Sequence, residues 1–135
     1  MKKILSNIVK FLKKKLKGAK CIFVMKYRYF NLSEFDSPDV KGSGSNMKHE
    51  FMVMLDDARH IANIPFKINS GYRTQEYQED LRKRGYKTAR KGTSPHLKGL
   101  AADISVIDSR SRWVVINSLM LAGFTRIGIA DTFIH

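Results

Sequence analysis

A histidine and an aspartate stand seven residues apart in the segment 94–103, which reads SPHLKGLAAD. His96 comes shortly before a glycine turn at Gly99. Asp103 lies in a segment with the alternating apolar pattern of a strand, on the face that does not carry the large apolar residues. Both side chains can therefore converge at the start of that strand. Neutral imidazole and carboxylate are ordinary zinc ligands, so the pair suggests part of a metal site.

A catalytic zinc needs three protein ligands and one open position, so a third ligand is required. The chain has one cysteine, Cys21, which excludes a CxxC thiolate site and leaves histidines and carboxylates. His49 and His60 fall in or beside a predicted helix, where a solvated surface position is the better interpretation. His135 closes a predicted strand at the end of the sequence. From the residue alone, two interpretations of His135 stay equally open: a polar residue at a frayed chain end, or a metal ligand.

The positive charge of the chain is concentrated at its N-terminus. The 135 residues support one domain with a short appendage, and they carry 25 Lys and Arg against 12 Asp and Glu, a net charge of +13. Residues 1–28 hold ten of the basic residues and no acidic one, which leaves 15 against 12, or +3, for residues 29–135. This balance, and the lack of a nucleic-acid-binding motif, argue against specific nucleic-acid binding by the domain.

Residues 1–18 have the pattern of a basic amphipathic helix. Seven apolar residues share one arc at helical spacing, and six lysines lie opposite them. The uncharged stretch is too short for a signal peptide or a membrane span. We therefore expect residues 1–28 to form a separate basic segment, in which residues 1–20 can contact an anionic membrane or envelope surface.

Residues 29–135 predict short strands interleaved with helices. Loop-forming residues fill 35–45 and 86–95. The predicted helices are 47–63, with Ser45 or Asn46 as N-cap, 74–84, and 110–122, with Gly123 as the C′ residue. The predicted strands are 66–69, 100–106, 124–129 and 133–135. This order of elements predicts one small α+β domain.

Two of these elements have predicted core faces. In the strand 100–106, the residues expected to share one face are Leu100, Ala102, Ile104 and Val106. In the helix 110–122, the residues expected in the core are Trp113, Val115, Ile116, Leu119 and Met120.

The ordered motifs resemble a known family. The pattern Ser-x-His-x-x-Gly-x-Ala-x-Asp at 94–103, preceded by SGYR at 70–73 and followed by FIH at 133–135, resembles the zinc D-alanyl-D-alanine carboxypeptidases and dipeptidases. It is most similar to the small phage-type peptidoglycan peptidases of that family, whose fold is shared with the zinc domain of hedgehog proteins. The resemblance covers residues 29–135. It implies a small antiparallel sheet with packed helices and one Zn²⁺ held by His96, Asp103 and His135.

The resemblance also implies a role for Arg73. Its guanidinium is permanently charged and forked, and can bind a peptide carboxylate or stabilise an oxyanion. The alternative is a surface ion pair with Glu76 or Asp80. Ser94 either hydrogen-bonds the substrate backbone or caps the loop around Pro95, and these two interpretations stay equally open.

The general base is where the sequence departs from the family pattern. Relatives commonly place Glu or Asp three residues before the last ligand histidine, where a carboxylate can accept a proton. That position holds Thr132 here, and Asp131 is one residue further back. Relatives also continue with Val-Asp after this histidine, so further active-site residues are expected beyond His135. Asp131 is the candidate base in the sequence given.

These residues predict zinc-dependent hydrolysis of peptidoglycan stem peptides, as a carboxypeptidase or an endolysin-type endopeptidase. One alternative is a zinc-binding module without turnover, favoured by the missing carboxylate at position 132. A second is a protein that acts on membranes or nucleic acid through its basic N-terminus. The lack of a signal peptide predicts a cytoplasmic protein in the producing cell that reaches the wall after release or lysis. The resemblance implies a phage or prophage origin.

Overall fold

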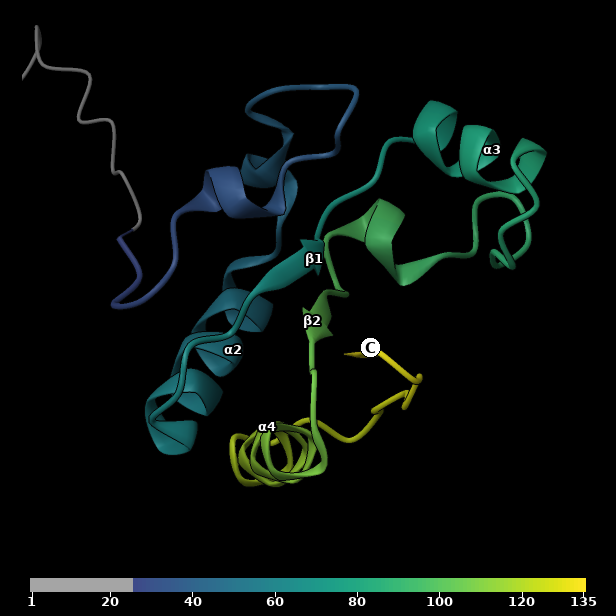
Figure 1. The fold of residues 1–135 in the computed structure, drawn as a ribbon. Coiled ribbons are helices and arrows are strands. Elements are labelled where there is room, and N and C mark those ends of the chain that lie inside the picture. Colours follow the sequence, from purple (N-terminus) through teal and green to yellow (C-terminus); the bar gives the residue numbers. More distant parts are fainter. Residues whose placement is uncertain (1–25) are drawn as a thin grey trace, which may run out of the picture.

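The computed structural model describes residues 26–135, and Figure 1 shows their arrangement. The α-helices are α2 (His49–Ala62), α3 (Gln75–Lys83) and α4 (Ser109–Leu121). The strands are β1 (Ile68–Ser70), β2 (Asp103–Ser105) and β3 (Phe133–Ile134). The described residues also form three 3₁₀ turns: η1 (Leu32–Phe35) and η2 (Ser43–Asn46) precede α2, and η3 (Pro95–Lys98) lies between α3 and β2. The predicted α+β class is confirmed, while the predicted N-terminal amphipathic helix lies outside the described residues.

The strands form a small antiparallel sheet in the order β1-β2-β3. Asp103, the first residue of the central strand, pairs with Ser70 of β1, and Ile104 pairs with Ile134 of β3. This register brings the residue after β3, His135, beside Asp103. Two segments that are far apart in the sequence therefore meet at one end of β2.

The core lies between this sheet and the helices α2 and α4 (Figure 1). Burial of each large apolar side chain contributes about 1.5–3 kcal/mol, so these contacts hold the sheet against the helices. The buried residues of the cluster are Phe30, Phe35, Met47, Met52, Leu55, Ala58, Phe66, Ala102, Ile104, Val106, Val115, Leu119 and Ile134.

Local hydrogen bonds explain where the helices begin and end. Thr74 caps α3, because its Oγ1 accepts from the backbone N–H of Tyr77 at 3.1 Å. Asp108 caps α4 in the same way through Ser111. The predicted C′ glycine of α4 is confirmed, since Gly123 has a φ of +103°. The predicted N-cap of α2 at Ser45 or Asn46 is wrong, because these residues belong to η2 and Lys48 is the residue before α2.

Three further expectations are wrong. Leu100 is 48% exposed, because β2 begins only at Asp103 and the chain before it still belongs to the turn after η3. Trp113 and Met120 lie on the solvent side of α4, at 67% and 63% exposed. The segment 124–129 is not a strand, and only Ile129 forms an isolated bridge, with Ile134.

The chain entering the domain is fixed to α2 by a buried carboxylate. Asp56 is 5% exposed and accepts hydrogen bonds from the backbone N–H groups of Arg28 and Tyr29. The Arg28 side chain also pairs with Asp56. This anchor holds the start of the described chain against α2. In the described part of the chain, no helix has the length and apolarity needed to cross a membrane.

Candidate metal centre

The turn η3 places His96 in the interior of the protein. Ser94 precedes the turn and Pro95 opens it, with the fixed φ that favours a first helical position. Gly99 ends it at a φ of +67°, and a Cβ at Gly99 would lie 2.2 Å from the carbonyl oxygen of Asn46. A glycine is therefore required there for both conformation and space. The resulting turn leaves His96 only 2% exposed.

Two hydrogen bonds join this turn to the segment 70–73. The carbonyl of His96 accepts from the backbone N–H of Arg73 at 3.2 Å, and Nδ1 of His96 lies 2.6 Å from the carbonyl oxygen of Gly71. A carbonyl oxygen can only accept, so Nδ1 carries the hydrogen. In the neutral ring, the lone pair is then on Nε2, which is the atom that faces Asp103 and His135. This is the usual support for a metal-binding histidine.

The ligand atoms of three residues converge, although 39 residues of sequence separate the first from the last. His96 Nε2 lies 3.3 Å from His135 Nδ1 and 3.5 Å from Asp103 Oδ1, and His135 Nδ1 lies 2.7 Å from the same oxygen. Ligand bonds of about 2.0–2.1 Å in a tetrahedral zinc site put neighbouring ligand atoms roughly 3.3 Å apart. Two of the three distances match this spacing. The donor set and its geometry therefore fit a zinc ion.

Backbone pairing with Gly128 holds His135 in place. The N–H of His135 donates to the carbonyl of Gly128 at 2.8 Å, and the N–H of Gly128 donates back at 2.7 Å. A Cβ at Gly128 would come within 3.2 Å of the Cβ of His135. The small residue therefore lets the two backbones approach closely enough to position the histidine ring.

The pKa of Asp103 lies well below its ordinary value. Burial by itself raises this pKa, but the hydrogen bonds with His135 and His96 and the charges of His96 and Arg73 outweigh it. Asp103 is thus ionised at neutral pH, as a metal ligand must be.

Arg73 is turned inward toward the same carboxylate. Its Nη2 donates to Asp103 Oδ2 at 2.7 Å, its Nε to Ser70 Oγ at 2.8 Å, and its Nη1 to Gln78 Oε1 at 3.3 Å. The alternative ion pair with Glu76 or Asp80 is not formed, and Asp80 instead pairs with Arg84. Arg73 therefore orients Asp103 through the oxygen that does not face the histidines.

The remaining residues singled out in the sequence lie in different places. Ser94 is buried, lines the cavity at the histidines and makes no side-chain capping bond, so the capping interpretation is not supported. Asp131 is exposed and does not line this cavity, and its backbone carbonyl accepts from Arg112. His49 and His60 are exposed on α2, where they contact Tyr27 and Tyr29.

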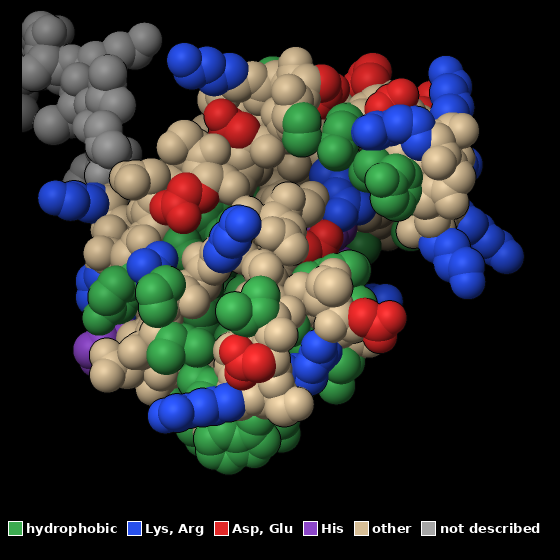
Figure 2. All heavy atoms as spheres, in the orientation of Figure 1, with side chains coloured by type: hydrophobic (Ala, Val, Ile, Leu, Met, Phe, Trp, Pro, Cys, Tyr) green, Lys and Arg blue, Asp and Glu red, His purple; other side chains and the backbone are tan. Residues whose placement is uncertain are grey.

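The cavity at the metal-ligand group also contains residues that the sequence reasoning missed. Gln78, Lys87 and Arg126 line it together with Arg73, Ser94 and the three candidate ligands. In Figure 2, a recess on this face shows a histidine surface between basic and acidic side chains. Lys87 and Arg126 come from loops with no motif in the sequence. Only the folded chain brings them to the site.

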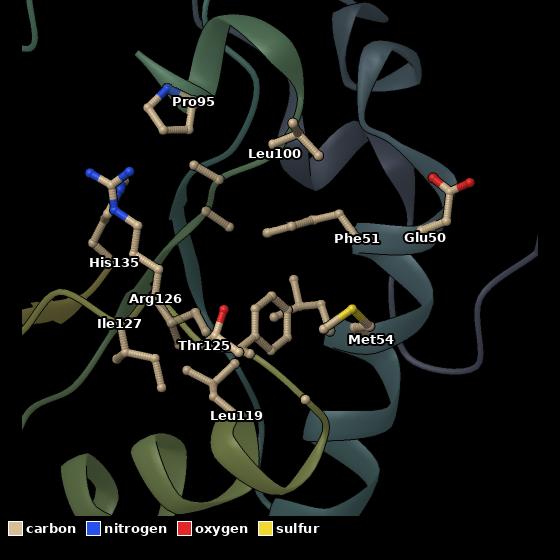
Figure 3. Close-up of a pocket in the computed structure, with 16 residues that line it drawn as sticks. Glu50, Phe51, Met54, Pro95, Leu100, Leu119, Thr125, Arg126, Ile127 and His135 are labelled. Atoms are coloured by element: carbon tan, nitrogen blue, oxygen red, sulfur yellow. The ribbon is translucent and has the colours of Figure 1, made fainter. Parts of the chain in front are cut away.

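A second, apolar cavity of about 310 Å³ adjoins the first (Figure 3). Phe51 and Met54 of α2, Leu119 of α4 and Ile127 line it. His135, Pro95 and Arg126 border both cavities. Of the three candidate ligands, His135 therefore borders both cavities, whereas His96 and Asp103 line the first one only.

Comparison with known proteins gives one match. The sequence model of the family described as Peptidase M15 matches residues 28–135. The searches of curated proteins and of solved structures gave no match. The matched range includes every candidate ligand and cavity residue described above.

Proposed function

The chain belongs to the Peptidase M15 family, and on that premise we propose that it is a zinc peptidase that hydrolyses peptide bonds in the stem peptides of bacterial peptidoglycan. Membership of this family supports the assignment of the protein as a metallopeptidase. The observation that carries the proposal is the convergence of His96, Asp103 and His135 within a cavity open to a substrate.

His96, Asp103 and His135 would hold the zinc ion. When bound, zinc lowers the pKa of a coordinated water toward neutrality and polarises a carbonyl group. The protein residues supply the fixed geometry. Nδ1 of His96 is held by Gly71, the backbone of His135 by Gly128, and the second oxygen of Asp103 by Arg73.

Arg73 has a second role in this proposal. Arg73 donates three hydrogen bonds to protein groups. A guanidinium has about five N–H groups, so two of them stay available to a ligand. The remaining N–H groups belong to the nitrogens that also contact Asp103 and Gln78, at the wall of the cavity. They are placed to donate to negative charge that develops on the substrate oxygen. Ser94, the residue before η3, also lines the cavity and is proposed to bind substrate backbone.

The proton acceptor that we propose is Asp131. It lies in the turn between Ala130 and Phe133, and both of these residues line the cavity. The carboxylate of Asp131 makes no hydrogen bond or ion pair with the described residues, so it is available to a ligand or a water molecule. Its replacement in Asp131→Asn should slow turnover and leave zinc binding unchanged.

The proposal is tested by digestion of purified peptidoglycan. We expect the zinc-loaded protein to release fragments whose masses identify the bond that is cut, and we expect a chelator to stop the release. His96→Ala should release none, while His60→Ala should behave as the wild type because His60 is exposed on α2. A protein that binds zinc in full but releases no fragment would instead be a zinc-binding module without turnover.

The basic segment at residues 1–20 is proposed to bring the enzyme to an anionic membrane or envelope surface. Access to the wall after release or lysis of the producing cell, as for a phage or prophage enzyme, is part of the same proposal. It rests on the sequence pattern alone, since this segment lies outside the described residues.

A further inference from the structure

The cavity at the candidate metal centre has an excess of positive charge. Arg73, Lys87 and Arg126 line it, and Asp103 is the sole acidic side chain among the described residues that do so. Asp103 is already engaged by Arg73 and by the two histidines. A bound zinc ion would add further positive charge. The recess is therefore suited to an anionic ligand.

The cations differ in what they can offer a ligand. Arg73 is 16% exposed and directs its hydrogen bonds toward Asp103, Ser70 and Gln78. Arg126 and Lys87 are exposed, and neither makes an ion pair with any described residue. The forked guanidinium of Arg126 can bind both oxygens of a carboxylate, whereas an ammonium acts as a point charge. Arg126 is thus the cavity residue best suited to bind a carboxylate, because its guanidinium has no ion-pair partner among the described residues.

The position of Arg126 is set by the chain that leads to His135. The segment after α4 places Arg126 two residues before Gly128, whose backbone pairs with His135. Figure 3 shows the Arg126 side chain extending past His135 toward Pro95, at the border of the polar and apolar cavities. A group bound to this guanidinium would therefore lie next to the metal-ligand group.

We propose that Arg126 binds a free carboxylate of the substrate peptide, with Lys87 as a second cation, and so selects peptides that carry a negative charge close to the scissile bond. This inference rests on the proposed peptidase function and names its substrate class. Arg126 is a specificity residue here, and Arg73 acts on the oxyanion and on Asp103. Stem peptides offer such a group at the C-terminus and on an acidic side chain, so the experiment separates these two sources.

The test compares three forms of one stem peptide that ends in D-Ala-D-Ala. One form has all carboxylates free, the second has its C-terminus amidated, and the third has its glutamate carboxylate amidated. A charge-assisted hydrogen bond contributes about 1.5–3 kcal/mol, which corresponds to a preference of roughly 10- to 150-fold in kcat/KM for the free form. The carboxylate that is recognised is the one whose amidation lowers kcat/KM relative to the free form.

Arg126→Gln should remove the preference, by lowering kcat/KM for the free form toward the value that the same variant shows for the corresponding amide. Arg126→Lys should retain part of it, because the charge remains but the fork is lost. Arg110→Gln is the matched control, since Arg110 is an exposed arginine that does not line the cavity. An equal loss on all three peptides, or a preference that survives Arg126→Gln, would overturn the proposal.

Calorimetric binding of the same peptides to the zinc-loaded protein gives a readout that does not need turnover. If the wild type cleaves none of them, the proposed function fails. Tighter binding of the free form, lost in Arg126→Gln, would still support the carboxylate site. Equal binding of all three forms by the wild type would overturn it.

Discussion

Nδ1 of His96 donates to the carbonyl oxygen of Gly71 at 2.6 Å, across 25 positions of sequence. This contact fixes which ring nitrogen carries the hydrogen, and it leaves Nε2 free toward Asp103 and His135. The chain at Gly71 also passes very close to η1. A Cβ at Gly71 would lie 2.6 Å from the Cα of Phe35. The SGYR motif thus contributes backbone geometry to the site in addition to the Arg73 side chain.

Gly71→Ala should therefore destabilise the fold and weaken zinc binding. Overpacking of this kind typically costs about 1–3 kcal/mol, because backbone atoms rather than a flexible side chain must move. Denaturant unfolding and a zinc titration of the variant would measure both effects. Gly85→Ala is the control, since Gly85 has a φ of +87° but no atom within 4 Å of an added Cβ. Equal zinc affinity in the two variants would contradict this role of Gly71.

Replacement of Arg73 should lower both the turnover of the enzyme and the stability of the metal-free protein. Loss of one oxyanion donor typically lowers kcat by about 10²–10³. The Arg73–Asp103 pair is largely buried, and removal of one partner leaves a charge without compensation. We expect Arg73→Ala to lose stability in the absence of zinc and to regain part of it when zinc is added. Normal turnover by this variant on peptidoglycan fragments would reduce Arg73 to a structural ion-pair residue.

The pKa of Asp103 predicts how stability depends on pH in the metal-free protein. Its folded pKa is lower than the ordinary value of 3.8, so the folded state binds fewer protons than the unfolded state. The contribution of Asp103 is therefore complete above pH 3.8 and is lost as the pH falls below that value toward the folded pKa. Unfolding free energies of the wild type and Asp103→Asn should differ by a constant amount near neutral pH and converge in acid. A difference that grows on acidification would contradict this assignment.

The basic N-terminal segment can be tested separately from the catalytic site. Deletion of residues 1–20 should abolish sedimentation with anionic vesicles and weaken lysis of whole cells. Activity on soluble wall peptides should remain nearly unchanged, because the domain is anchored through Arg28, Tyr29 and Asp56. Vesicles of neutral lipid are the control. If the deletion unfolds the domain, the segment belongs to the core and the targeting proposal is wrong.

The sequence allowed part of this site to be predicted, for identifiable physical reasons. The glycine turn and the strand pattern placed His96 and Asp103 together, because both depend on local geometry. His135 needed the family resemblance, since nothing in its neighbours distinguishes a ligand from a chain end. The Arg73–Asp103 pair and the location of Arg126 depend on contacts between distant segments, which local patterns do not encode. The prediction that Trp113 lies in the core was wrong for a similar reason. Periodicity shows which apolar residues share a helix face, but not whether another element covers that face.

The central claim is that His96, Asp103 and His135 form one zinc site, and an equilibrium zinc titration of the purified protein tests it most directly. The wild type and the exposed-histidine variants His49→Ala and His60→Ala should each bind about one zinc per chain, as in a single three-ligand site. His96→Ala, Asp103→Ala and His135→Ala should each lose it or bind it far more weakly. Full zinc occupancy in His96→Ala together with its loss in His49→Ala or His60→Ala would contradict the assignment.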